Sequence, residues 1–182
     1  LATSSAASDV YKRQMLDEIE TRPGQPNKKL VNIDIPEEDK FLELKGSRQN
    51  LKSISSLLSV QEGCDKFCSF CVVPYTRGVE ISRPAKQILN EAQELIDIGA
   101  KEIILLGQNV NAWSQSNGKD TDMTFAQLIN EISELNIERI RYITSHPRDM
   151  TEGLMRAHRD IEKLQPYLPV SYTHLRAHET QR

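Results

Sequence analysis

Between residues 51 and 168 the sequence alternates short apolar segments with longer segments whose apolar residues recur at helical spacing. The short segments at 53–60, 102–106 and 139–143 predict β-strands, because each is a brief apolar run between polar turns. The longer segments predict amphipathic helices. The first helix is predicted to begin at Ser82–Pro84 and to end at Gly99, the second to begin at Thr124, and the third to run from Thr151 to about Arg159. A fourth strand is predicted to begin around Leu164–Leu168.

Residues that typically cap helices mark the predicted boundaries. Ser82 is two residues before Pro84, so we predict that Ser82 caps this helix and that the proline lies in its first turn, where a missing N–H costs nothing. Thr124 and Gln127 have the spacing of a capping box, in which each side chain bonds to the backbone N–H of the other. Gly99 predicts the C-terminal end of the first helix.

The repeated order of strand and helix predicts an α/β fold with a parallel sheet or barrel. Three predicted strand–helix units would form a partial (β/α) barrel, about half of an eight-stranded one. Chemistry in such folds gathers at the carboxyl ends of the strands. The polar segments that follow the three strands, Gln61–Val79, Gly107–Trp113 and Thr144–Arg148, are therefore where we expect the site.

Composition narrows the class of protein further. The chain has 182 residues, of which 38% are hydrophobic and 27% charged, with a net charge of −3. These values are typical of a soluble globular protein. The longest apolar run, Ile103–Leu106, is far shorter than the roughly 20 residues of a membrane helix. Residues 1–14 lack the apolar core of a signal peptide. We therefore predict a cytoplasmic protein that does not associate with membranes.

The two ends of the chain differ from the rest. Residues 4–14 and 169–180 resemble translated sequencing adapters, so we expect 1–14 and 169–182 to be adapter-derived. Each end carries a net charge of +1, which leaves −5 on the segment between them and no electrostatic footprint for nucleic acid. Residues 15–50 are polar and charged with several prolines, and predict the end of a helix followed by an interdomain linker.

All three cysteines lie within eight residues, at Cys64, Cys68 and Cys71, with the spacing C-x3-C-x2-C. In a reducing compartment this spacing indicates metal or redox chemistry rather than a disulfide scaffold. A 4Fe–4S cluster normally takes four thiolates, so three would leave one iron with an open position for a substrate. The alternative is a Cys3His zinc site in which His146 supplies the fourth ligand.

The pattern C-x3-C-x-aromatic-C, formed by Cys64, Cys68, Phe70 and Cys71, resembles the signature of the radical S-adenosylmethionine superfamily. The resemblance implies that the three cysteines bind a 4Fe–4S cluster whose open iron holds S-adenosylmethionine, and that Phe70 packs near the adenine. An electron from the cluster would cleave S-adenosylmethionine to methionine and a 5′-deoxyadenosyl radical. Residues 51–168 would then form an incomplete radical SAM core, a partial barrel of about three βα units.

Longer stretches resemble the methylthiotransferase family within that superfamily. They are Glu62–Cys64, Cys71–Gly78, Ser82–Pro84, Leu105–Trp113 and Thr144–Pro147. The last two are similar to the branch that acts on N6-isopentenyladenosine in tRNA. The resemblance implies that the whole protein adds a methylthio group to carbon 2 of this nucleoside, next to the anticodon. Residues 15–50 would then include the end of an amino-terminal methylthiotransferase domain.

The resemblance also implies cofactors and partners beyond this chain. Family members bind a second 4Fe–4S cluster through three cysteines of an amino-terminal domain, and this sequence has no further cysteine. The expected partners are tRNA and an electron donor such as a flavodoxin or ferredoxin, and we expect a monomer. We expect the chain alone not to complete the reaction. The alternatives are a sister methylthiotransferase acting on another modified adenosine or a ribosomal-protein aspartate and, in another class, a non-catalytic zinc-binding module.

Polar residues near the predicted strand ends are further candidates. Gly107, Gln108 and Asn109 could bind the polar groups of S-adenosylmethionine or form only a turn, and we predict ligand contact. Arg77 and Arg83 could bind a carboxylate or phosphate, or form structural salt bridges.

Two ring side chains complete the candidates. His146 lies on the predicted active face, where a structural hydrogen-bonding role competes with direct chemistry. Trp113 could stack on a base or anchor the packing of its loop. No catalytic residue is predicted beyond the cluster ligands.

Overall fold

The computed structural model describes residues 53–69, 71–116 and 122–170, which all belong to one compact unit. The helix end and linker predicted at 15–50 lie outside this part of the chain.

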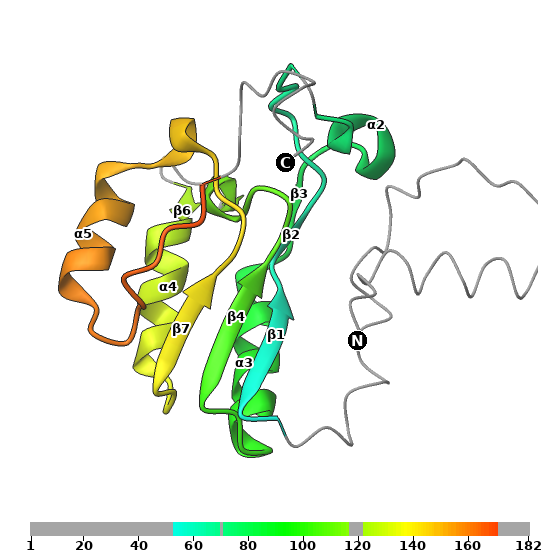
Figure 1. The fold of residues 1–182 in the computed structure, drawn as a ribbon. Helices are drawn as coiled ribbons and strands as arrows, with labels where there is room; N and C mark the ends of the chain where they lie inside the picture. Colours follow the sequence, from blue (N-terminus) through cyan, green and yellow to red (C-terminus); the bar gives the residue numbers. More distant parts are fainter. Residues whose placement is uncertain (1–52, 70, 117–121, 171–182) are drawn as a thin grey trace, which may run out of the picture. The chain divides into compact units, whose positions relative to one another are not determined.

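Three parallel strands form the central sheet (Figure 1). They are β1 (Ser55–Ser59), β4 (Glu102–Leu106) and β7 (Arg139–Tyr142), in the order β1-β4-β7. A helix connects each strand to the next, which is how neighbouring parallel strands are joined. The predicted α/β fold is confirmed, and the sheet of the described residues is open, as in a partial barrel.

Three helices cover one face of this sheet: α3 (Ala85–Asp97), α4 (Phe125–Glu134) and α5 (Glu152–Asp160) (Figure 1). Alternate strand residues point toward them and have no exposed surface, namely Leu58, Ile103, Leu105, Ile140 and Tyr142. On the opposite face Leu57 remains 39% exposed. This alternation places the hydrophobic core between sheet and helices. Among the described residues, we find no helix that is both long and apolar enough to traverse a bilayer.

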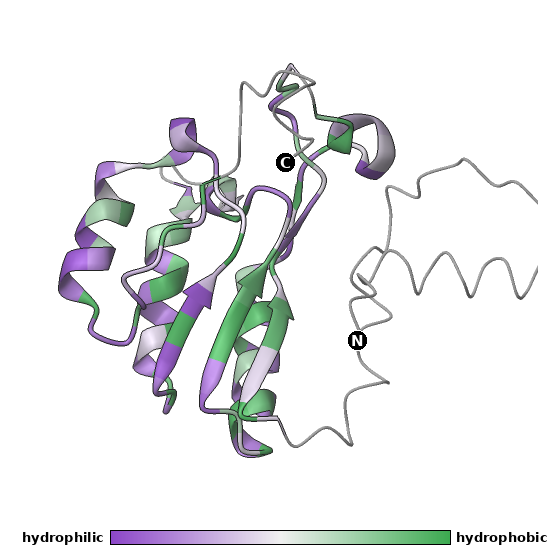
Figure 2. Cartoon of the chain, viewed as in Figure 1, coloured by the Kyte–Doolittle hydropathy of each residue, from purple (hydrophilic) through white to green (hydrophobic). Residues whose placement is uncertain are grey.

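The central strand is the most hydrophobic of the three (Figure 2). β4 is hydrophobic over most of its length, whereas β7 alternates arginine with apolar residues. Glu102, at the start of β4, accepts a hydrogen bond of 2.6 Å from Ser55 Oγ and pairs with Arg141 at 3.3 Å. Polar groups on neighbouring strands therefore bond to one another across the sheet.

Two of the three capping predictions are confirmed. Thr124 and Gln127 form both bonds of the capping box at the start of α4, and Gly99 follows the last turn of α3 with φ +109°. The capping role predicted for Ser82 is wrong. Ser82 belongs to β3 (Ile81–Ser82), and the Gln115 side chain accepts the Ala85 N–H at 2.6 Å instead. A residue distant in sequence thus replaces the local cap.

The loop predicted after β4 contains short elements. They are η2 (Val110–Ala112) and the antiparallel pair β5 (Ser114–Gln115) and β6 (Met123–Thr124). The fourth strand predicted to begin around Leu164–Leu168 is not continuous in the described residues, because no named strand is assigned there. The backbone makes isolated parallel bridges there, from Ile140 to Leu164 and from Ser145 to Val170.

Candidate metal centre

The three cysteines lie on one loop that leaves the carboxyl end of β1. The loop follows β2 (Gln61–Glu62), which pairs with β3, and continues into α2 (Val73–Arg77). Cys64 is buried, and Cys68 and Cys71 are half-buried. All three thiols are free of disulfides. The loop thus presents three thiols at the edge of the sheet where the fold predicts the site.

Gly63 brings this loop close to the backbone of the residues after α2. Its φ is +77°, and a Cβ at this position would overlap the Val79 carbonyl group. The adjacent Cys64 N–H donates to the Gly78 carbonyl at 3.2 Å. Only glycine has both the conformation and the space for this approach. The position of Cys64 therefore depends on the residue before it.

Gln61 ties the cysteine loop to the loop after β4. Its side chain is 2% exposed, and its Oε1 accepts the N–H groups of Gln108 at 2.9 Å and Asn109 at 3.0 Å. Its Nε2 donates to the Gly63 carbonyl at 2.6 Å. In return, the Gly63 N–H donates to Gln108 Oε1 at 2.7 Å. One buried amide therefore fixes both loops.

The predicted cofactor-binding residues after β4 lie against this amide. A Cβ on Gly107 would come within 2.5 Å of Gln61 Oε1, so the glycine permits the close approach of the two loops. Asn109 is 2% exposed and donates to Asp149 Oδ2 at 2.8 Å, while its Oδ1 has no hydrogen-bond partner. A buried acceptor without a donor is costly unless a ligand supplies one. Phe70 lies outside the described residues.

Charged residues surround the cysteine loop. Lys66 pairs with Asp149 at 2.7 Å, which links the loop to η3 (Pro147–Asp149) after β7. Burial raises the pKa of the Glu80 carboxyl, and Asp65 and Asp149 raise it further against the opposing effect of Lys66. Burial likewise raises the pKa of the Cys64 thiol, with a smaller contribution from Glu80. Coordination to a cation would counteract this rise in the pKa of Cys64 by stabilising the thiolate.

The structure brings His146 to the cysteine loop. Its Nε2 lies 3.5 Å from Cys68 Sγ, although 78 residues separate them. The ring is buried, and its Nδ1 accepts the Arg148 N–H at 3.2 Å.

The residues present fit an iron–sulfur cluster. Three free thiols share one loop, and Asn109, which is linked to that loop through Asp149 and Lys66, has a buried oxygen without a donor. Within the described ranges, no three His, Cys, Asp or Glu side chains converge closely enough to hold a single metal ion. Ligands of one ion must meet at a point, whereas three cysteines on a cluster each bind a different iron atom. The donor set of three free thiols is compatible with a cluster.

Two arginines and a tryptophan have structural contacts. Arg77 pairs with Glu62 at 3.7 Å, and Arg83 pairs with Glu91 at 2.5 Å while 3% exposed. These contacts confirm the salt-bridge alternative. Trp113 is 1% exposed and donates to the Arg83 carbonyl at 2.9 Å. A ring so deeply buried has no free face, so the packing alternative holds for Trp113 and base stacking does not.

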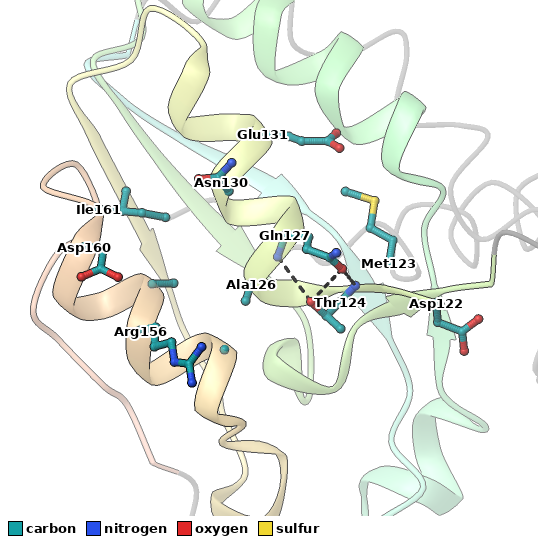
Figure 3. A pocket seen from close by; sticks show the side chains of 12 residues that line it. Asp122, Met123, Thr124, Ala126, Gln127, Asn130, Glu131, Arg156, Asp160 and Ile161 are labelled. Carbon is teal, nitrogen blue, oxygen red and sulfur yellow. Dashed lines mark hydrogen bonds between the residues drawn. The ribbon is translucent and has the colours of Figure 1, made fainter. Parts of the chain in front are cut away.

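A separate open pocket of about 600 Å³ lies between α4 and α5 (Figure 3). It is lined by polar side chains such as Gln127, Asn130 and Arg156, and by none of the predicted site residues. The chemistry of the cysteine loop therefore lies elsewhere in the fold.

Comparison with known families agrees with this site. The sequence model of the radical SAM superfamily matches residues 58–175. The chain therefore belongs to the radical SAM superfamily. Membership implies a 4Fe–4S cluster and S-adenosylmethionine, and the spacing of Cys64, Cys68 and Cys71 is consistent with the superfamily pattern.

Within that class, the chain is similar to proteins named tRNA-2-methylthio-N(6)-dimethylallyladenosine synthase. The one from Ruegeria pomeroyi is 54% identical over 152 residues, which are 83% of this chain and 34% of that protein. The one from Zymomonas mobilis is 54% identical over 141 residues, 77% of this chain and 31% of that protein. The one from Agrobacterium fabrum is 49% identical over 144 residues, 77% and 32% respectively. The chain spans about a third of the length of these curated relatives.

Sequence reasoning missed two buried side chains that hold the site together. In the sequence, Gln61 stands out only as part of one polar segment, and Asn111, which bonds to the His146 backbone, as part of another. Their contacts with other loops bridge 35 to 48 residues, so no local pattern predicts these contacts. The weak signal was a polar residue directly after a predicted strand, where site residues of this fold gather.

Proposed function

We propose that Cys64, Cys68 and Cys71 bind a 4Fe–4S cluster with one open iron, and that the whole protein is a tRNA methylthiotransferase. Its substrate would be N6-isopentenyladenosine next to the anticodon, which would receive a methylthio group at carbon 2. The observation that carries the proposal is the loop of three free thiols, which Gln61 ties to the loop that holds the buried, unpartnered Asn109 oxygen. The relatives that share half of their aligned residues with this chain bear the corresponding name.

In this proposal the residues of the two loops have distinct roles. Cys64, Cys68 and Cys71 would hold the cluster, which would supply the electron for cleavage of S-adenosylmethionine. Asn109 Oδ1 accepts a hydrogen bond from a polar group of that cofactor, and Gln108 and Gly107 shape the loop that presents it. Phe70 packs against the adenine. Gln61 keeps the two loops in register, so that ligand and cluster meet with little loss of conformational entropy.

The remaining partners follow from the same proposal. The substrate is tRNA, and the electron comes from a small donor such as a flavodoxin or ferredoxin. We propose that the whole protein binds a second 4Fe–4S cluster through residues outside this sequence, whose only cysteines are the three of this loop. We propose that the protein acts in the cytoplasm as a monomer.

A chimaera tests the assignment of substrate. Residues 53–168 of this chain would replace the matching segment of the Ruegeria pomeroyi relative, because the chain covers about a third of that protein. We expect the chimaera to methylthiolate tRNA that carries N6-isopentenyladenosine, measured by mass spectrometry of the digested nucleosides. The matched control is the same chimaera with Cys68→Ser, which should form no product.

Two results would contradict the proposal. One is a folded, cluster-loaded chimaera that forms no methylthio product while the unmodified relative is active. The other is product formation only on tRNA with a different modified adenosine, which would indicate a sister activity.

A further inference from the structure

Asn111 holds the backbone of His146 in place. The His146 N–H donates to Asn111 Oδ1 at 2.9 Å, and Asn111 Nδ2 donates back to the His146 carbonyl at 2.9 Å. Both residues are buried: His146 is 7% exposed and Asn111 is 6% exposed. A reciprocal pair of hydrogen bonds in a buried setting fixes the point from which the ring projects.

The ring itself is fixed in one tautomer. Nδ1 accepts the Arg148 N–H at 3.2 Å, so in the neutral ring the proton lies on Nε2. Nε2 is the atom 3.5 Å from Cys68 Sγ. The histidine therefore presents an N–H donor to the sulfur of a proposed cluster ligand.

We propose that His146 is a positioning residue that donates a hydrogen bond to the Cys68 sulfur and thereby raises the reduction potential of the bound cluster. Reduction adds negative charge that is shared with the cysteine sulfurs, and a hydrogen-bond donor stabilises that charge. This inference rests on the proposed cluster. It gives His146 a role outside the ligand set, unlike the Cys3His alternative considered from the sequence.

The test is a redox titration of the 182-residue chain after anaerobic reconstitution with iron and sulfide, followed by electron paramagnetic resonance. His146→Leu removes the donor, whereas His146→Gln retains an N–H group. We expect His146→Leu to lower the ratio of reduced to oxidised cluster about tenfold at a fixed potential, ~59 mV for a one-electron couple. His146→Gln should recover most of this change. His158→Gln is the matched control, because His158 bonds to Tyr142 and not to the cysteine loop.

Each result of this titration either supports or overturns the role proposed for His146. An unchanged midpoint potential in His146→Leu with an intact cluster would overturn the inference and leave the proposed function standing. Loss of the cluster in both His146 variants would also overturn it, by making the ring a ligand or a folding requirement. Loss in His146→Leu alone would support it, because the donor would then be what matters. Failure of the unsubstituted chain to bind a cluster would overturn the proposed function, and this inference with it.

Discussion

Replacing Gly63 by alanine is expected to lower the free energy of unfolding by roughly 2–5 kcal/mol and to prevent retention of a cluster. Two costs add. An L-residue at φ +77° is strained, and the new Cβ would overlap the Val79 carbonyl, so the backbone beside Cys64 must move. Urea unfolding followed by circular dichroism measures the first effect. Iron analysis after reconstitution measures the second.

Gly153 provides the matched control for this substitution. It lies in α5, and the nearest atom to an added Cβ would be the Ala126 Cβ at 3.7 Å, an ordinary contact. Gly153→Ala should therefore raise the free energy of unfolding by up to about 1 kcal/mol, because alanine favours the helix. Equal behaviour of the two variants would show that the cysteine loop does not require the tight approach at Gly63.

Removing the Glu91 carboxylate is expected to cost about 3–5 kcal/mol of stability, because it leaves a buried guanidinium without its closest counter-charge. The Arg83 side chain is 4% exposed, and its Nη1 lies 2.5 Å from Glu91 Oε2 and 3.2 Å from the Ser59 carbonyl. This group joins α3 to the end of β1, directly before the cysteine loop. The measurement is the urea midpoint of Glu91→Ala.

The surface pair of Lys101 and Glu138 is the control for this second substitution. Their atoms are 2.9 Å apart, close to the separation in the buried pair, but the side chains are 56% and 60% exposed. Solvent screens such a pair, so Glu138→Ala should leave the midpoint almost unchanged. A Glu91→Ala variant as stable as Glu138→Ala would contradict the burial that the structure assigns to Arg83.

Local sequence rules accounted for most of the fold. β4 spans the predicted residues 102–106, and the capping box of Thr124 is present, because both depend on neighbours within a few positions. The cap predicted at Ser82 failed for the opposite reason. Pairing of Ser82 with Gln61 and the distant Gln115 amide determine where α3 begins, and neither is encoded near the helix.

The sequence predicts where the candidate site lies in the fold, but not which contacts its side chains make. The cysteines directly follow a predicted strand in the sequence, and this order of elements places them at the carboxyl end of that strand. Which polar residues are buried depends on packing. Arg83 and Trp113 were candidates for ligand contact and turned out to be buried and bonded within the fold. The contact of His146 with Cys68 arises only when two loops meet, and Phe70 stays a prediction.

The central claim is that the cysteine loop binds a 4Fe–4S cluster, and metal analysis after anaerobic reconstitution tests it most directly. We expect equal amounts of iron and acid-labile sulfide bound to the chain, and we expect both to be lost when Cys64, Cys68 and Cys71 are together replaced by serine. Zinc bound without sulfide would contradict it and favour the Cys3His alternative. Iron and sulfide retained by the triple variant would contradict it as well.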